Sequence, residues 1–403
     1  MKIIVGFVFS VALCAQTKTV TDAEVMRVHK SAFLIDTHND ITSRTVTGYD
    51  IGKNKDDGHT NIAGMKAGGV GAQFFAVFVA ANYVEGNHSA NRTLEMIDTV
   101  RHDIIAAYPN DFQFAGTVAE IEAARKNGKI AALMGIEGGH AIEDSLRLLR
   151  DFYALGIRYM TLTHSNTNNW ADSSGDMDKP GVTHHNGLTP FGKDVVREMN
   201  RLGMMVDISH VADKTFWDTL ETSTAPVFAS HSSCRAVSNV PRNMTDQMMV
   251  ALAKKGGVMQ INFSCDFLSQ ASADASKSFQ ATMRTMKPEE MRARMEEYRK
   301  TVPPATLADV VAHIDHAVKV AGIDAVGIGS DFDGIFCVPT GLEDVSKFPN
   351  LTRALLEKGY TAEDIRKIYG ANLLRVMRGV EKESARLSKR AGINSRLFSE
   401  PRP

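Results

Sequence analysis

Short apolar runs recur along the chain, each followed by a polar or glycine-rich turn and then by an amphipathic helical pattern. Near-continuous apolar strands that alternate with helices indicate parallel strands buried on both faces. Eight such runs favour an α/β fold of the (β/α)8 TIM-barrel type over an open sheet. The runs occupy residues 33–36, 70–79, 130–136, 157–162, 203–208, 227–230, 257–262 and 326–329.

Some of the intervening helices can be placed from the sequence. Residues 144–155 carry apolar side chains at helical spacing and are followed by Gly156, a typical helix stop. Thr361 and Asp364 predict a capping box that opens a helix through residue 368. Further helices are expected over residues 19–31, 306–320 and, as a charged and solvated insertion before the last strand, 287–300.

The N-terminal stretch has the pattern of a secretory leader. One lysine precedes an unbroken apolar run to Ala15, and polar residues begin at Gln16. The run is too short for a comfortable membrane span. We therefore expect removal of residues 1–15, a single barrel domain over residues 16–403, and a secreted or periplasmic protein. Two alternatives stay open: a buried N-terminal strand or helix, or lipid attachment at Cys14.

Composition narrows the class of protein further. The 403 residues are 43% hydrophobic, which supplies a large core, and carry a formal net charge of −1 with a pI near 6.9. Such a chain has no basic footprint for nucleic acid. No other apolar run reaches the length of a membrane span, so no transmembrane segment is expected after leader removal. Cys14 is one of four cysteines, and its removal would leave material for at most one disulfide.

The first apolar run ends in the sequence FLIDTHND, which carries Asp36, His38 and Asp40. Side chains two residues apart on an extended chain point the same way, so His38 and Asp40 can aim at one point. The motif alone is better explained as a capped strand end with turn-forming aspartates. The rest of the chain has to decide between these interpretations.

Other runs end in the same kinds of side chain. Barrel enzymes carry their active sites at the C-terminal ends of the strands, and seven residues with metal-binding chemistry follow six of the eight runs. Each one alone could be a structural residue, but together they predict a site. The seven are His38, Asp40, Glu137, His164, His210, His231 and Asp331.

This set of four histidines and three carboxylates suits zinc or a similar divalent metal better than magnesium or calcium. Seven groups exceed what one catalytic metal needs, and a carboxylate bridging a pair of metals would use them better. A metal pair that lowers the pKa of a shared water implies hydrolysis. We expect His184, His185, His313 and His316 to be surface or supporting residues rather than ligands.

Nine motifs carry a family resemblance, and they occur in order between about residues 30 and 380: DTHND, GGVGAQFFAVFV, GIEGG, TLTHSNTNNWADS, VDISH, SHSSCRAV, PRNMTDQ, GSDFDG and GLEDVSKFPNL. Together they resemble the membrane (renal) dipeptidase family of zinc metallopeptidases. The resemblance implies a metal-dependent hydrolase barrel with two Zn²⁺ ions per chain. His38 and Asp40 would hold one zinc, His210 and His231 the other, and Glu137 would bridge both.

The same resemblance implies roles for further residues. His164 would contact the substrate and stabilise the oxyanion, and Arg242 would grip the C-terminal carboxylate of the substrate. Asp331 would exchange a proton with the metal-bridging hydroxide and the leaving amine. Asp333 is the alternative for this role, and Asp36 is expected to be a supporting residue.

The sequence also departs from the mammalian members of that family. Residue 238 is serine and the C-terminal end is polar, so neither their disulfide-linked dimer nor their lipid anchor is implied, although a homodimer stays open. The segment QINFSCDFLS lacks a tyrosine, which leaves specificity undetermined. The leading hypothesis is a dipeptidase for L-Xaa-L-Xaa and L-Xaa-D-Xaa substrates. Alternatives are an amidohydrolase acting on another small amide, lactam or ester, and a non-catalytic binding protein on the same barrel.

Overall fold

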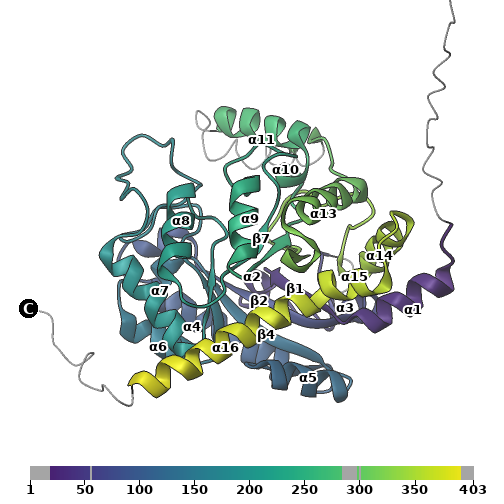
Figure 1. The fold of residues 1–403 in the computed structure, drawn as a ribbon, viewed down its shortest axis with the longest axis horizontal. Coiled ribbons are helices and arrows are strands. Elements are labelled where there is room, and N and C mark those ends of the chain that lie inside the picture. Colours follow the sequence, from purple (N-terminus) through teal and green to yellow (C-terminus); the bar gives the residue numbers. More distant parts are fainter. Residues whose placement is uncertain (1–18, 55–56, 284–296, 299–300, 392–403) are drawn as a thin grey trace, which may run out of the picture.

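The computed structural model describes residues 19–54, 57–283, 297–298 and 301–391 (Figure 1). The predicted leader with Cys14, and most of the charged segment 287–300, lie outside the described residues. The expectations for these two segments therefore stay predictions.

Parallel strands form a nearly closed barrel in the order β1, β2, β4, β5, β6, β7, β8, β9, and β3 pairs with β4 outside this ring. A parallel bridge between Asn39 and Phe332 brings β1 next to the segment that follows β9. The backbone N–H of Asp40 also donates to the carbonyl of Phe332 at 2.8 Å. The strands are β1 (Leu34–Asn39), β2 (Val70–Phe78), β3 (Phe112–Phe114), β4 (Ile130–Glu137), β5 (Ile157–Thr161), β6 (Met205–Asp207), β7 (Phe228–Ser232), β8 (Val258–Ile261) and β9 (Val326–Ile328).

The eight apolar runs correspond to the eight strands of the ring, so the predicted (β/α)8 barrel is confirmed. Strand β3 was not predicted. It is three residues long, contains the polar Gln113, and pairs in parallel with the first residues of β4. Three residues give too little periodicity to reveal a strand.

The helices surround the barrel, as Figure 1 shows. The α-helices are α1 (Asp22–Ala32), α2 (Thr42–Thr45), α3 (Ile62–Ala67), α4 (Ser89–Thr99), α5 (Val118–Lys126), α6 (Leu146–Ala154), α7 (Pro190–Leu202), α8 (Asp213–Thr222), α9 (Asp246–Lys254), α10 (Cys265–Leu268), α11 (Gln270–Met283), α13 (Leu307–Ala321), α14 (Phe348–Glu357), α15 (Ala362–Arg366) and α16 (Asn372–Ala391). Short 3₁₀ segments are η1 (Ala81–Val84), η3 (Gly139–Ile142), η4 (Ile323–Ala325) and η5 (Val345–Lys347), and π-helical segments are η2 (Val100–Ala106) and η6 (Lys367–Ala371).

Capping explains where the predicted helices begin. Helix α6 starts two residues later than expected, because Glu143 and Asp144 have φ of 45° and 54° and Ser145 provides the N-cap. The predicted capping box of Thr361 and Asp364 is present at α15. A second capping box, absent from the predictions, opens α13.

The core inside the barrel differs from the core between strands and helices. On β4, Ala131 and Leu133 point into the barrel, while Ala132 and Met134 pack outside it. Helix α16 contributes Leu373, Val376, Met377 and Val380 to the inner core. The helix thus packs across the N-terminal end of the barrel, beside Arg158 and Met205 at the starts of β5 and β6.

The segment between β8 and β9 contains the described helices α10 and α11, which precede the charged segment predicted as an insertion. A disulfide joins Cys265 at the start of α10 to Cys337 in the loop after β9, with Cα atoms 5.5 Å apart. Cys234 is a buried free cysteine. In the described part of the chain no helix has the length and apolarity to cross a membrane.

Candidate active site

The seven predicted residues meet at the C-terminal end of the barrel. His38 lies in β1 and Glu137 is the last residue of β4, while His231 lies in β7. The other four follow a strand by one to three residues, which is where a barrel presents its loops. They are Asp40 after β1, His164 after β5, His210 after β6 and Asp331 after β9.

Glu137 lies at the centre of this group, and its two oxygens face different partners. Oε2 is 3.5 Å from Nε2 of His38, whereas Oε1 is 3.0 Å from Nε2 of His210 and 3.2 Å from Nε2 of His231. His164 lies further out, with Nε2 3.8 Å from the same Oε1. A carboxylate placed between His38 on one side and His210 and His231 on the other has the geometry of a bridging ligand.

His38 and Asp40 form the other half of the group. Nε2 of His38 is 3.2 Å from Oδ2 of Asp40, which agrees with the prediction that the two side chains aim at one point. This buried nitrogen makes no hydrogen bond to any described residue. The ring stacks on His231 with a centroid distance of 3.7 Å, so the two halves are in direct contact.

Local backbone conformation aims two of the loop residues. His210 and Asp331 have φ of 64° and 63°, a left-handed conformation that few residues other than glycine adopt. Gly334 makes the close approach of the carboxylates possible, since a Cβ there would lie 2.3 Å from Oδ2 of Asp40 and 2.6 Å from Oδ1 of Asp331. The loop after β9 is therefore shaped around the carboxylates.

Asp331 and Asp333 occupy different environments. Oδ1 of Asp331 lies 4.0 Å from Nε2 of His38, and Oδ2 accepts a hydrogen bond of 2.8 Å from Nδ2 of Asn262. Asp333 accepts from the backbone N–H of His59 and lies 3.8 Å from Arg44. Of the two aspartates considered for proton transfer, Asp331 is the one that the structure brings to the site.

Arg242 reaches the site from the loop between β7 and α9. Its Nη2 donates to the backbone carbonyl of His231 at 2.7 Å. Nε and Nη1 are buried and have no hydrogen-bond partner among the described residues. A buried guanidinium with two unused donors needs an acceptor, because leaving such donors unpaired is costly.

Burial and neighbouring charge set the protonation states. Burial, helped by the charge of Arg242, holds the pKa of His210 well below its ordinary value, and burial lowers the pKa of His231 in the same way. Burial alone would raise the pKa of Glu137, but the surrounding imidazoles outweigh it and lower that pKa well below the ordinary range. The neutral imidazoles of His210 and His231 are ready-made metal ligands.

Burial also shifts the pKa values of Asp331 and Arg242 away from their ordinary values. Burial, together with the neighbouring carboxylates, raises the pKa of Asp331 well above its ordinary value. Burial lowers the pKa of Arg242 to about 10, which still leaves the guanidinium charged at neutral pH. A carboxyl group that holds a proton more readily than usual suits acid–base chemistry.

The donor set fits divalent metal ions of the zinc type. Nitrogen and carboxylate oxygen donors fall into three groups of three residues, with ligand atoms in each group within 4.8 Å of one another. The unpaired Nε2 of His38 is explained if it binds a metal. The groups are His38, Asp40 and Glu137; Glu137, His164 and His210; and His38, His231 and Asp331.

Supporting residues behind the ligands were mostly missed by sequence reasoning. Nδ1 of His231 lies 2.7 Å from Oγ of Ser230, which donates to the buried carboxylate of Asp207 at 2.6 Å. Asp36, expected to be a supporting residue, accepts from the backbone and hydroxyl of Ser330 at 2.8 and 2.7 Å. It therefore links β1 to the end of β9 and does not belong to the metal-binding groups.

The other histidines considered lie away from the metal-binding groups. Nε2 of His185 bonds the carbonyl of Asn168, and His316 pairs with Asp246. His184 lies beside Asp172. His313 is fully buried and contacts Cys234 and Leu268 through its ring nitrogens, so of the two expected roles it has the supporting one.

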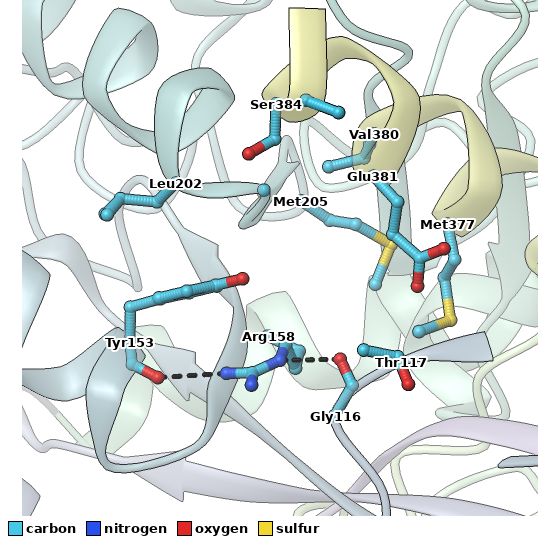
Figure 2. A pocket seen from close by; sticks show the side chains of 12 residues that line it. Gly116, Thr117, Tyr153, Arg158, Leu202, Met205, Met377, Val380, Glu381 and Ser384 are labelled. Atoms are coloured by element: carbon cyan, nitrogen blue, oxygen red, sulfur yellow. Dashed lines mark hydrogen bonds between the residues drawn. The ribbon is translucent and has the colours of Figure 1, made fainter. Parts of the chain in front are cut away.

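A cavity of about 230 Å³ lies at the opposite end of the barrel, beneath α16 (Figure 2). Arg158, at the start of β5, lines it and donates through Nε to the carbonyl of Gly116 at 2.6 Å and through Nη1 to that of Tyr153 at 2.9 Å. Glu381 accepts from the backbone N–H of Val118 at 2.9 Å. Arg158 and Glu381 in this cavity are thus bonded to the backbone.

Comparison with known proteins agrees with the geometry of the site. Residues 22–391 match the sequence pattern of the membrane dipeptidase family, peptidase family M19. The chain belongs to this family. An uncharacterized dipeptidase of Schizosaccharomyces pombe is 36% identical over 394 residues, covering 93% of this chain and 87% of that protein.

Solved structures in this family share the fold. The probable dipeptidase PvdM of Pseudomonas aeruginosa is 25% identical, with a TM-score of 0.79 over 90% of this chain and 98% of that one. A metallopeptidase of Rhodobacter sphaeroides, liganded with a phosphinate mimic of L-Ala-D-Ala, is 27% identical, with a TM-score of 0.72 over 86% of this chain and 99% of that one. The protein is accordingly a metallo-dipeptidase, a hydrolase built on a (β/α)8 barrel.

Proposed function

We propose that this metallo-dipeptidase is zinc-dependent and hydrolyses dipeptides of both L-Xaa-L-Xaa and L-Xaa-D-Xaa type. In this proposal His38 and Asp40 hold one zinc, His210 and His231 hold the other, and Glu137 bridges them. The observation that carries it is the position of Glu137, whose two oxygens face the two sets of nitrogen donors at 3.5 Å and at 3.0 and 3.2 Å.

Arg242 supports recognition of a free C-terminal carboxylate. Its Nε and Nη1 are buried without a partner among the described residues, and a planar guanidinium matches a carboxylate with two parallel hydrogen bonds. Phe267 lies beneath the guanidinium, with the ring centroid 5.3 Å from Cζ. This contact restricts the orientation of the guanidinium. Binding of the substrate's C-terminal carboxylate to Arg242 would then determine which end of the peptide enters the site.

The proposed roles of the remaining residues follow from their environment. When bound, zinc ions polarise the scissile carbonyl and lower the pKa of a water molecule. Asp331 would accept the proton of that water and return it to the leaving amine, because one of its oxygens is fixed by Asn262 while the other lies toward His38. His164 would donate a hydrogen bond to the oxyanion from the more exposed side of the group.

Tolerance of a D residue at the C-terminal position is proposed from a relative. The metallopeptidase of Rhodobacter sphaeroides binds a mimic of L-Ala-D-Ala, and this chain presents the same class of barrel. Anchoring through the carboxylate alone would place little restriction on the stereochemistry of the adjacent carbon.

A secreted or periplasmic location is part of the same proposal. The leader-like sequence of residues 1–15 predicts export. The disulfide between Cys265 and Cys337 supports it, since disulfides persist in oxidising compartments and are rare in the cytosol.

The deciding experiment combines metal analysis with a dipeptide panel. Purified protein is expected to carry about two zinc ions per chain, and to cleave matched L-L and L-D dipeptides in a zinc-dependent manner. A single tightly held iron, or full activity after chelation, would contradict the proposal. Cleavage of N-terminally blocked dipeptides but not of C-terminally amidated ones would support the role of Arg242.

A further inference from the structure

A buried tyrosine lies directly behind the imidazole of His38. Tyr159 of β5 is fully buried inside the barrel, and its hydroxyl oxygen is 2.8 Å from Nδ1 of His38. The same hydroxyl lies 3.2 Å from the backbone carbonyl of Thr37. The Tyr159 hydroxyl therefore contacts the side of the His38 ring that faces away from Asp40 and Glu137.

The two contacts together determine where the protons lie. A phenol has one proton to donate, and the carbonyl of Thr37 can act only as an acceptor. Both bonds form when the hydroxyl donates to Thr37 and accepts from Nδ1–H of His38. In this tautomer Nε2 of His38 carries the free lone pair, and Nε2 is the buried atom without a hydrogen-bond partner among the described residues.

We infer that Tyr159 is a positioning residue for His38, which fixes the tautomer and the ring orientation in which Nε2 can bind a metal ion. This inference rests on the proposed zinc site. Groups that hydrogen-bond the second nitrogen of a ligating histidine commonly control metal affinity in this way.

Packing fixes the hydroxyl in place. The ring of Tyr159 contacts Phe74 and Phe228 at centroid distances of 5.3 and 5.4 Å. Gly135 leaves room for it, because a Cβ at residue 135 would lie 2.0 Å from Cζ of the tyrosine. The glycine two residues before Glu137 is thus required for the support of His38.

His231, a proposed ligand of the other zinc ion, is supported differently from His38. Nδ1 of His231 bonds Ser230, which is backed by the carboxylate of Asp207. Neither Ser230 nor Asp207 forms a hydrogen bond with Tyr159, whose hydroxyl contacts His38 and Thr37. Loss of the tyrosine hydroxyl should therefore affect the metal bound by His38 more than the metal bound by His231.

The test is the zinc affinity of Tyr159→Phe, measured on the full protein by competition with a chromophoric chelator. The substitution keeps the ring and removes only the hydroxyl. We expect one of the zinc ions to bind about 10- to 100-fold more weakly, with the other affected less. Gly135→Ala should weaken the same zinc, because it displaces the ring while keeping the hydroxyl.

Tyr369→Phe is the matched control. Tyr369 is also fully buried, and its hydroxyl lies 2.7 Å from Oγ1 of Thr352, which belongs to none of the metal-binding groups. Both tyrosine variants should lose similar thermal stability after chelation, but Tyr369→Phe should bind zinc as the unmodified protein does. Equal affinities for Tyr159→Phe and the unmodified protein, or an equal loss in the control, would overturn the inference. Failure of the unmodified protein to bind zinc would instead contradict the proposed function.

Discussion

The two ends of the barrel treat their polar side chains in opposite ways. At the C-terminal end, Nε2 of His38 and two donors of Arg242 are buried without a hydrogen-bond partner among the described residues. At the N-terminal end, Arg158 and Glu381, which belongs to α16, both bond the backbone (Figure 2). Polar groups that stabilise a fold are satisfied within it, whereas groups that bind a ligand are left for that ligand.

The largest effect is expected from the centre of the C-terminal end. Glu137→Gln should remove at least one metal ion and lower kcat/KM by at least about 10⁴-fold, since a neutral amide is a poor bridge between two cations. Metal analysis and dipeptide kinetics check this. Glu381→Gln is the control at the opposite end, because the amide oxygen can still accept from Val118. A similar loss of activity in both variants would contradict the assignment of function to the C-terminal end alone.

Arg242→Ala should have the next largest effect. Loss of the carboxylate partner should cost about 2 to 5 kcal/mol of binding, seen mainly as a higher KM for dipeptides. Arg158→Ala should leave KM unchanged and lower stability, because its donors serve backbone carbonyls. An unchanged KM for Arg242→Ala would remove this residue from substrate recognition.

A pH-dependent loss of stability is expected in the scaffold around the site. His313 accepts from the backbone N–H of Cys234 at 3.0 Å and bonds the carbonyl of Leu268 at 3.0 Å. Burial lowers its pKa to about 4, so protonation favours the unfolded chain. Its contribution is complete above about pH 6.5 and is lost progressively as the pH falls to about 4, a span of about 3 kcal/mol.

Chelated protein unfolded in denaturant at a series of pH values measures this span without interference from bound metal. His313→Gln should be less stable at neutral pH and show a shallower decline toward acid. His140, whose pKa burial also lowers to about 4, remains in the variant and accounts for part of the residual slope. Parallel curves for the two proteins would contradict the assignment to His313.

The smallest effect is expected from filling the cavity beneath α16. Ala385 lines it from an exposed position on the helix, and Ala385→Met should raise the free energy of unfolding by up to about 1 kcal/mol. Thermal unfolding measures the change. Dipeptide kinetics should be unaltered, and altered kinetics would mean that this end of the barrel takes part in function.

Hydrophobic patterning was sufficient to predict the eight ring strands, because buried parallel strands are marked by continuous apolar runs. It missed β3, where three residues give no measurable period. Helix α6 was predicted to start two residues too early, since nothing in the pattern reveals the positive φ of Glu143 and Asp144. Element type followed from local sequence, whereas boundaries depended on backbone conformation.

The site shows the same division. Ligand chemistry at the strand ends was visible in the sequence, since histidine and carboxylate after an apolar run is a rare combination. Asp331 was favoured over Asp333 because it comes first after the eighth apolar run, but the sequence could not show what each carboxylate contacts. Contacts with Asn262 for one and with His59 for the other separate them.

Local sequence was enough to predict the barrel, the family and the residue types available for metal binding. Only the tertiary structure decided how they are supported: Tyr159 behind His38, Ser230 and Asp207 behind His231, and Asp36 joining β1 to the end of β9. The physical reason is distance along the chain. Apolar periodicity is a local property that each segment carries alone, whereas a hydrogen bond between residues 38 and 159 exists only after the barrel closes.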